Sequence, residues 1–262
     1  MILALKLFLT PLLIAAVTLA GRRWGPGVSG WFMGLPLTSA PVSMILAWQY
    51  GPAFAAHAAI GTLGGQASVC IFCFTYALAA RRLAWLPSGF LAVTAFLAAT
   101  FVWNRFALSL LPTFATLLVI IFVLFRLFPD GVPAGPAQQG PAPRAPRWDI
   151  PARMLIAATF VVLLTTFAAS LGPQLSGLLS PFPVFGLVLA TFTHHQQGSR
   201  PAARLLRGVV LGSLSFACFF LVAGALLPGA GAATAAAAIV PTYLAASLVA
   251  LSVNGLSLRL AR

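Results

Sequence analysis

The chain of 262 residues is 61% hydrophobic and 6% charged, with a mean hydropathy of +1.02. These values exclude an ordinary soluble domain and indicate a membrane protein, because an apolar run of about 20 residues spans a bilayer as a helix. The runs are continuous rather than alternating, which argues against a β-barrel. The net charge of +13 does not indicate nucleic-acid binding, since the basic residues stand in small groups at the ends of apolar runs.

The apolar runs predict an all-α polytopic membrane protein of about nine transmembrane helices. The first run resembles a signal peptide, with Lys6 before an apolar stretch that ends in Leu19-Ala20-Gly21. We expect it to be retained as a helix, because it repeats inside the chain. In chain order the predicted spans are 2–20, 31–49, 57–80, 84–103, 106–128, 152–170, 177–194, 205–227 and 232–254.

The middle of the chain repeats itself at an offset of 147 residues. Segment 25–73 aligns with 172–220 without a gap, and 13 of the 49 positions are identical, most of them Gly, Pro or Ser. The arginines do not repeat: Arg22 and Arg81 face Ala169 and Pro228, for example. Since arginine placement sets the orientation of membrane helices, two copies with complementary arginines predict an inverted-topology repeat.

This repeat divides the chain into two four-helix units and the segments that join them. The predicted units are residues 1–104 and 151–262, and helix 105–128 is the extra crossing that inverts the second unit. Segment 129–150 is rich in Pro, Gly and Ala and predicts an extended cytoplasmic connector. It contains both acidic residues of the protein, Asp130 and Asp149.

The basic residues also predict the orientation. With the N-terminus outside and the C-terminus inside, 13 of the 15 basic residues lie on the cytoplasmic side, and only Lys6 and Arg105 lie outside. We therefore expect a multi-pass membrane protein with this orientation. The cytoplasmic set is Arg22, Arg23, Arg81, Arg82, Arg126, Arg144, Arg147, Arg153, Arg200, Arg204, Arg207, Arg259 and Arg262.

Two sequence features recur in both units at helix positions. Glycines four residues apart, Gly61 with Gly65 and Gly208 with Gly212, lie on one helix face and predict a close helix contact. Paired prolines, Pro36 with Pro41 and Pro181 with Pro183, stand early in the predicted helices 2 and 7. Interrupted helices at matching places in two inverted halves indicate the central site of a transporter. The alternative is a simple kink packed against its neighbours.

Few polar residues accompany these breaks. The candidate substrate-binding residues are Pro36, Thr38, Ser39, Gln49, Pro183 and Gln196. Histidine is the side chain whose ordinary pKa lies near neutral pH, so His194 and His195 are the candidates for proton coupling. Placement of Trp, Tyr and His at the membrane interface is the alternative explanation for the ends of both helices.

Some functions are disfavoured by what the sequence lacks. No Asp or Glu lies in a predicted span, so a cationic substrate has little to bind, and a neutral, amphipathic or anionic substrate fits better. We expect no enzyme, because no nucleophile, base and orienting group form a recognisable catalytic set. We expect no metal and no other cofactor, since Cys70 and Cys73 lack the further ligands of a zinc site.

The second half resembles a known family at Gly177-Leu178 and at Phe182-Pro183-Val184-Phe185. Further matches are a basic helix start, Arg204-Leu205-Leu206-Arg207-Gly208, and the segment Ser213-Leu214-Ser215-Phe216. These residues resemble the GlpM-like family of small bacterial inner-membrane proteins, each about half this length with about four helices. The resemblance covers residues 152–254 and implies that the chain is two such units joined head to tail. It implies a location in the bacterial inner membrane and no chemistry.

These observations predict a small secondary transporter or flippase. Its expected partners are the lipid bilayer and a small-molecule or lipid-like substrate, bound between helices 2 and 7, and no nucleic acid. The alternative is a membrane scaffold that does not transport and that accompanies an envelope-biosynthesis enzyme. The alternative protein partner is a second copy of the chain, in a homo-oligomer.

Overall fold

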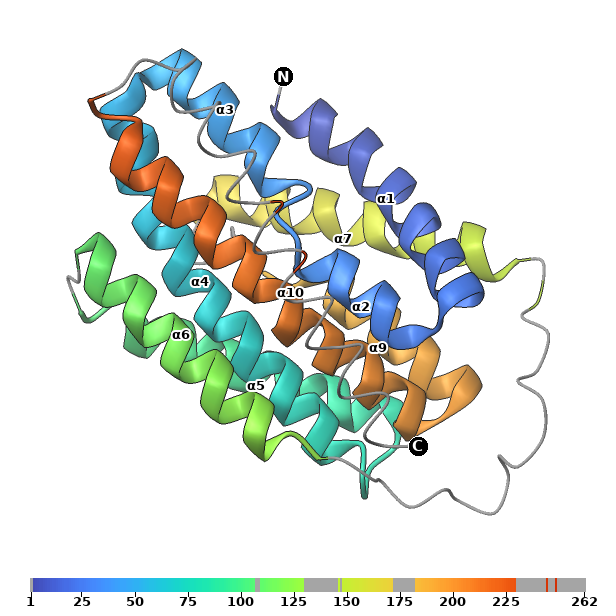
Figure 1. The fold of residues 1–262 in the computed structure, drawn as a ribbon. Coiled ribbons are helices and arrows are strands. Elements are labelled where there is room, and N and C mark those ends of the chain that lie inside the picture. The colour runs from blue at the N-terminus through green and yellow to red at the C-terminus, as the bar shows by residue number, and fades with distance from the viewer. Residues whose placement is uncertain are drawn as a thin grey trace.

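The computed structural model describes residues 2–106, 109–129, 146, 148–171, 182–229, 244 and 248. Every element within this part of the chain is a helix (Figure 1), as the all-α prediction requires. The helices are α1 (Ile2–Trp24), α2 (Pro26–Gly34), α3 (Ser39–Tyr50), α4 (Pro52–Ala79), α5 (Trp85–Trp103), α6 (Leu110–Leu127), α7 (Asp149–Leu171), α9 (Val184–Gln197) and α10 (Ser199–Leu226).

Several of these helices are long and apolar enough to cross a membrane, which supports a multi-pass membrane protein. In the described part of the chain the spans of this kind are Pro26–Tyr50, Pro52–Ala79, Trp85–Trp103, Leu110–Leu127 and Ser199–Leu226. The first of them contains both α2 and α3. Of the predicted ninth helix, 232–254, only residues 244 and 248 are described, and the start of the predicted seventh helix also lies outside the described residues.

The observed helices extend beyond several of the predicted spans. Helix α1 continues through Arg22 and Arg23, and α10 begins at Ser199, before its apolar run. Charged residues end an apolar run but not a helix, because a helix satisfies its own backbone when it leaves the membrane. The predicted span 31–49 consists of two helices separated by residues 35–38, which is the interruption expected at Pro36.

Helix α10 lies at the centre of the bundle. It packs against α2, α4, α6 and α9, while α1 packs against α7 on the other side of α2 (Figure 1). The largest core cluster is formed mainly by α4 and α10, with Leu63, Phe72 and Tyr76 from one helix and Leu206 and Phe220 from the other. These two antiparallel helices are therefore the scaffold on which the other elements are placed.

The contact between α2 and α10 is unusually close because glycines line it. A Cβ atom built on Gly34 would lie 2.6 Å from the Cα atom of Gly212, and one built on Gly30 would collide with the backbone of Leu205. Such clashes show that only glycine permits this backbone separation. The predicted packing role is therefore confirmed for Gly208 and Gly212, whereas Gly61 has open space where its Cβ would be.

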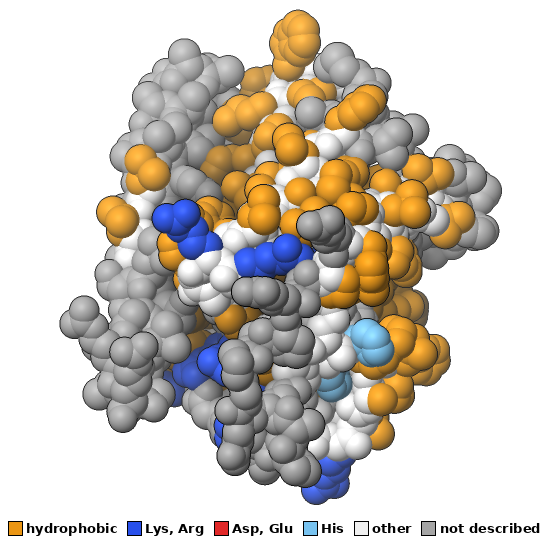
Figure 2. Space-filling model, turned by 90° about the vertical axis from the view of Figure 1, so that its right-hand side faces the viewer, with side chains coloured by type: hydrophobic (Ala, Val, Ile, Leu, Met, Phe, Trp, Pro, Cys, Tyr) orange, Lys and Arg blue, Asp and Glu red, His pale blue; other side chains and the backbone are white. Residues whose placement is uncertain are grey.

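The outer surface is apolar over much of its area. Figure 2 shows hydrophobic side chains gathered over a large part of the described surface on one face. Large apolar side chains such as Trp48 and Phe90 are 82% and 74% exposed. Contiguous exposed apolar surface of this kind is rare on soluble monomers, and lipid is the environment that it suits.

Candidate functional site

The break between α2 and α3 is a tight turn centred on Pro36. The backbone N–H of Leu37 donates to the carbonyl oxygen of Leu35 at 2.8 Å, and the N–H of Ala40 donates to the carbonyl of Pro36 at 2.8 Å. Proline has no N–H to continue the helix from α2, so the chain turns and a new helix begins. The predicted interruption at Pro36 is confirmed.

Pro183 makes the same turn at the start of α9. The N–H of Val184 donates to the carbonyl of Phe182 at 2.8 Å, and the N–H of Leu187 donates to that of Pro183 at 2.8 Å. The φ and ψ angles of Pro183, −80° and 60°, are those of an inverse γ-turn. Each of these two hydrogen bonds has a counterpart at Pro36 between the residues 147 positions earlier. Ser180 and Pro181 lie outside the described residues.

A small cavity lies beside the first break. Its volume is about 30 Å³. Since a cavity needs about 10–15 Å³ to hold one water molecule, it has room for about two. The residues that line it come from α1, α2, the break itself and α9. Among the described lining residues, Thr38 is the one with a hydroxyl group. The lining residues are Leu13, Val17, Phe32, Met33, Leu35, Leu37, Thr38 and Phe185.

This cavity joins the two elements between which the sequence predicted a binding site. Thr38 comes from the break after α2, and Phe185 comes from the first turn of α9. The two residues are 147 positions apart, so they occupy equivalent places in the repeated sequence. The lining is more apolar than the predicted set of hydroxyls and amides, because aliphatic and aromatic side chains supply the other walls.

The structure separates the predicted site residues into three groups. Pro36, Thr38 and Ser39 lie at the first break, and Pro183 lies at the start of α9. Gln49 lies at the far end of α3, where its side chain is exposed. The remaining group, Gln196 with His194 and His195, lies at the last turn of α9, about 18 Å along the helix from its first residue.

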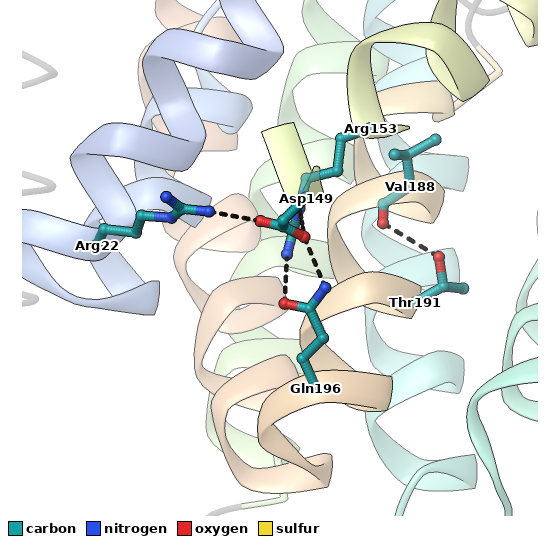
Figure 3. A network of polar contacts seen from close by, with 6 residues as sticks. All are labelled: Arg22, Asp149, Arg153, Val188, Thr191 and Gln196. Carbon is teal, nitrogen blue, oxygen red and sulfur yellow. Dashed lines mark hydrogen bonds and ion pairs between the residues drawn. The ribbon is translucent and has the colours of Figure 1, made fainter. Parts of the chain in front are cut away.

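Gln196 belongs to a network of charged groups (Figure 3). Its Nε2 donates to Oδ1 of Asp149 at 2.6 Å. Arg153 donates from Nε to the same oxygen at 2.9 Å and from Nη2 to Oε1 of Gln196 at 3.4 Å. Arg22 donates from Nη2 to Oδ2 of Asp149 at 2.8 Å. The network therefore connects α1, α7 and α9, and Gln196 does not line the cavity.

Asp149 is the functional residue that the sequence reasoning missed. It was assigned to the connector 129–150, whereas it is the first residue of α7 and is only 1% exposed. Two local signals point to this role. A carboxylate is stabilised in the first turn of a helix, and Arg153 stands four residues later on the same helix face. Asp130 lies outside the described residues.

The ionisation of Asp149 predicts how stability depends on pH. Burial raises the pKa of Asp149, but hydrogen bonds from Arg153, Gln196 and Arg22, with the charge of Arg153, outweigh burial and hold it below the ordinary value. A carboxyl group of this kind stabilises the fold fully above about pH 4, its unfolded pKa, and loses that contribution as pH falls through the folded pKa.

We therefore expect the native chain to have a higher melting temperature than Asp149→Asn. The difference between the two should be constant between about pH 6 and 8 and should shrink below about pH 4. Thermal unfolding in detergent, followed by circular dichroism, measures this margin. Asp130→Asn removes the only other acidic side chain and is the matched control. A margin that grew on acidification would contradict the ion-pair interpretation.

The two histidines contact aromatic side chains near the end of α9. Nδ1 of His194 is hydrogen bonded to the hydroxyl of Tyr76 at 3.4 Å. The ring of His195 packs edge-on against Trp85, with 5.4 Å between centroids. Both rings join α9 to the α4–α5 region and lie away from the cavity, so proton coupling through them would have to act through the helix.

A buried polar pair connects the centres of α4 and α10. Nε2 of Gln66 donates to Oγ of Ser213 at 2.7 Å, and Ser213 donates to the carbonyl of Val209 at 2.9 Å. The thiol of Cys70 lies 3.5 Å from the same hydroxyl. Hydrogen bonds between helices stabilise pairs inside membranes. Gln66 and Ser213 are 147 residues apart, so they occupy equivalent positions in the repeated sequence.

Within the described residues, no group of three His, Cys, Asp or Glu side chains is placed to hold a metal ion. Cys70 and Cys73 are buried in the core as free thiols. Comparison with known proteins gives no assignment, since no family model, no curated protein and no solved structure matches the chain. The candidate site consequently rests on its own geometry.

Proposed function

We propose that the chain is a small secondary transporter or flippase that binds an amphipathic, anionic or neutral substrate between the first helix break and α9. The observation that carries the proposal is the pair of identical proline turns, of which the first borders the cavity and the second precedes the cavity residue Phe185. Matching interruptions in two halves of a chain are typical of transporter sites.

The proposed inverted repeat is supported by helix boundaries that recur at the offset of 147. Helix α4 (Pro52–Ala79) and helix α10 (Ser199–Leu226) begin and end 147 residues apart. Helices α4 and α10 both have 28 residues and follow Gly51 and Gly198, whose φ angles are 89° and 91°. Positive φ at these two glycines lets the chain turn sharply between consecutive helices.

Contacts between equivalent elements support the same architecture. Helix α1 packs against α7, and α4 packs against α10. Gln66 bonds to Ser213, its own equivalent. Equivalent elements meet when a pseudo-two-fold axis passes between them, and an axis in the membrane plane gives inverted halves. In this proposal the nine helices, the outside N-terminus and the cytoplasmic C-terminus follow from the arginine distribution.

The cavity limits what the described conformation can hold. Pockets for drug-sized ligands are about 300–1,000 Å³, and this one is about 30 Å³. An amphipathic substrate therefore requires the halves to rock apart. The apolar walls suit a hydrocarbon portion, while Thr38 and the first turns of α3 and α9 offer donors to a polar or anionic headgroup.

The scaffold function is the second candidate, and the small cavity is the observation that favours it. A scaffold needs no path through the bundle, and the close α2–α10 contact gives a rigid body. It would present its apolar outer face to an envelope-biosynthesis enzyme. The resemblance to GlpM-like proteins fits both candidates, because it implies the architecture and no activity.

Reconstitution in liposomes tests transport. The probe is phosphatidylglycerol with a fluorescent headgroup, whose movement between leaflets is followed by quenching from outside. We expect Pro36→Ala with Pro183→Ala to slow movement by about tenfold, since a continuous helix would close the break. Pro52→Ala, at the first position of α4, is the matched control because proline is not a helix breaker there.

The histidines are tested in the same vesicles with a pH gradient. His194→Gln with His195→Gln should remove the effect of the pH gradient on the rate of probe movement. Without a gradient, the rate should stay near that of the native chain. Equal rates for the native chain, both double variants and empty vesicles would reject transport of this probe and favour the scaffold.

A further inference from the structure

The Asp149 network joins the two proposed halves at one end of the bundle. Arg22 belongs to the first half, whereas Asp149, Arg153 and Gln196 belong to the second (Figure 3). Asp149 is one of only two acidic residues in the chain, and both of its oxygens accept bonds from arginines. This buried carboxylate holds α1 against α7 directly and links both to α9 through Gln196.

The network lies at the end of elements that form the cavity wall. Helix α1 lines the cavity with Leu13 and Val17, and Arg22 follows Val17 by about 7 Å along the helix. Helix α9 lines it with Phe185 and carries Gln196 in its last turn. Separation of α1 from α9 at this end would therefore open the cavity toward the face that carries the arginines.

The opposite end has no counterpart in the sequence. The positions equivalent to Asp149 and Arg22 are Ile2 and Ala169, and neither can form an ion pair. Within the part of the chain that the structure describes, an ionic closure is therefore found at one end of the repeated architecture. The two ends must consequently open by different means.

We propose that the Arg22–Asp149 ion pair is a latch that closes the cavity toward the arginine-bearing face and breaks during each cycle. This inference rests on the proposed transport function. The side chain of Arg22 is 38% exposed, so water can solvate it when the pair separates. Asp149 keeps Arg153 and Gln196 as partners, so opening leaves no buried charge uncompensated.

Thiol labelling in sealed membrane vesicles tests the latch without any substrate. Thr38→Cys places a reporter in the cavity lining, and a membrane-impermeant maleimide is added to the arginine-bearing face. Labelling of the chain without this reporter gives the background from Cys70, Cys73 and Cys218. We expect Arg22→Gln to raise the labelling rate of the reporter about fivefold, the shift expected from losing one partly exposed ion pair.

Two further variants make the result specific. Arg23→Gln removes a neighbouring exposed charge that makes no contact with Asp149 among the described residues, and it should leave the rate unchanged. Arg22→Lys keeps the positive charge, so the labelling rate of the reporter should return most of the way to that of the chain with Arg22. Equal rates for Arg22→Gln and Arg23→Gln would overturn the latch.

The labelling result and the transport result are independent. A faster rate with Arg22→Gln supports the latch even if the lipid probe does not move, since only the conformation is measured. A moving probe with no labelling difference would leave transport in place and remove the latch.

Discussion

Replacing Gly212 with leucine should prevent α2 from packing on α10 and leave little folded protein in the membrane. A Cβ atom at this position would lie 2.8 Å from the Cα atom of Gly34, and closer still to the carbonyl oxygen of Trp31. Both obstacles are backbone, so no side chain can rotate away. Overpacking of this kind costs about 3 kcal/mol or more.

Gly61→Leu is the control for this experiment, because Gly61 belongs to the same motif in the first half and has open space at its Cβ position. The amount of monodisperse protein after detergent extraction, and its melting temperature, measure the effect. If both leucine variants are recovered equally, the close α2–α10 contact does not determine assembly.

Asp149→Asn should be the most damaging substitution of a polar residue that the structure describes. The amide keeps the shape of the carboxylate but not its charge, so Arg153, which is 3% exposed, remains charged without an anionic partner. Removing one member of a buried ion pair costs about 3–5 kcal/mol. Chemical unfolding in detergent, compared with Asp130→Asn, measures this loss.

A second variant separates charge from packing. Asp149→Leu with Arg153→Met removes both buried charges, and it should recover a large part of the stability lost in Asp149→Asn. If the double variant were less stable than the single one, the bonds to Arg22 and Gln196 would matter more than the unpaired charge of Arg153.

The sequence predicted the elements whose cause is local. The helix break at Pro36 and the start of α9 after Pro183 follow from a residue that cannot donate a backbone hydrogen bond. The close packing of Gly208 and Gly212 follows from their shared helix face. Helix ends were less predictable, because α1 and α10 remain helical through their arginines.

The misplaced residues are those whose environment is built by distant parts of the chain. Gln196 looked like a binding residue because it repeats as Gln49, yet in the structure it bonds to Asp149, 47 residues away. Asp149 looked solvated because its preceding sequence is a connector, and only the approach of Arg22 from α1 completes its environment. Hydropathy and spacing along one segment contain no information on such contacts.

The hydrogen bond between Gln66 and Ser213 shows what a single chain can do that two identical subunits cannot. In a symmetric homodimer, a position on the two-fold axis meets a copy of itself, so the two side chains in contact there are the same. Here a long amide reaches a short hydroxyl, which in turn donates to the carbonyl of Val209. In the proposed repeat, joining the two halves in one polypeptide therefore lets one of two equivalent positions be the hydrogen-bond donor and the other the acceptor.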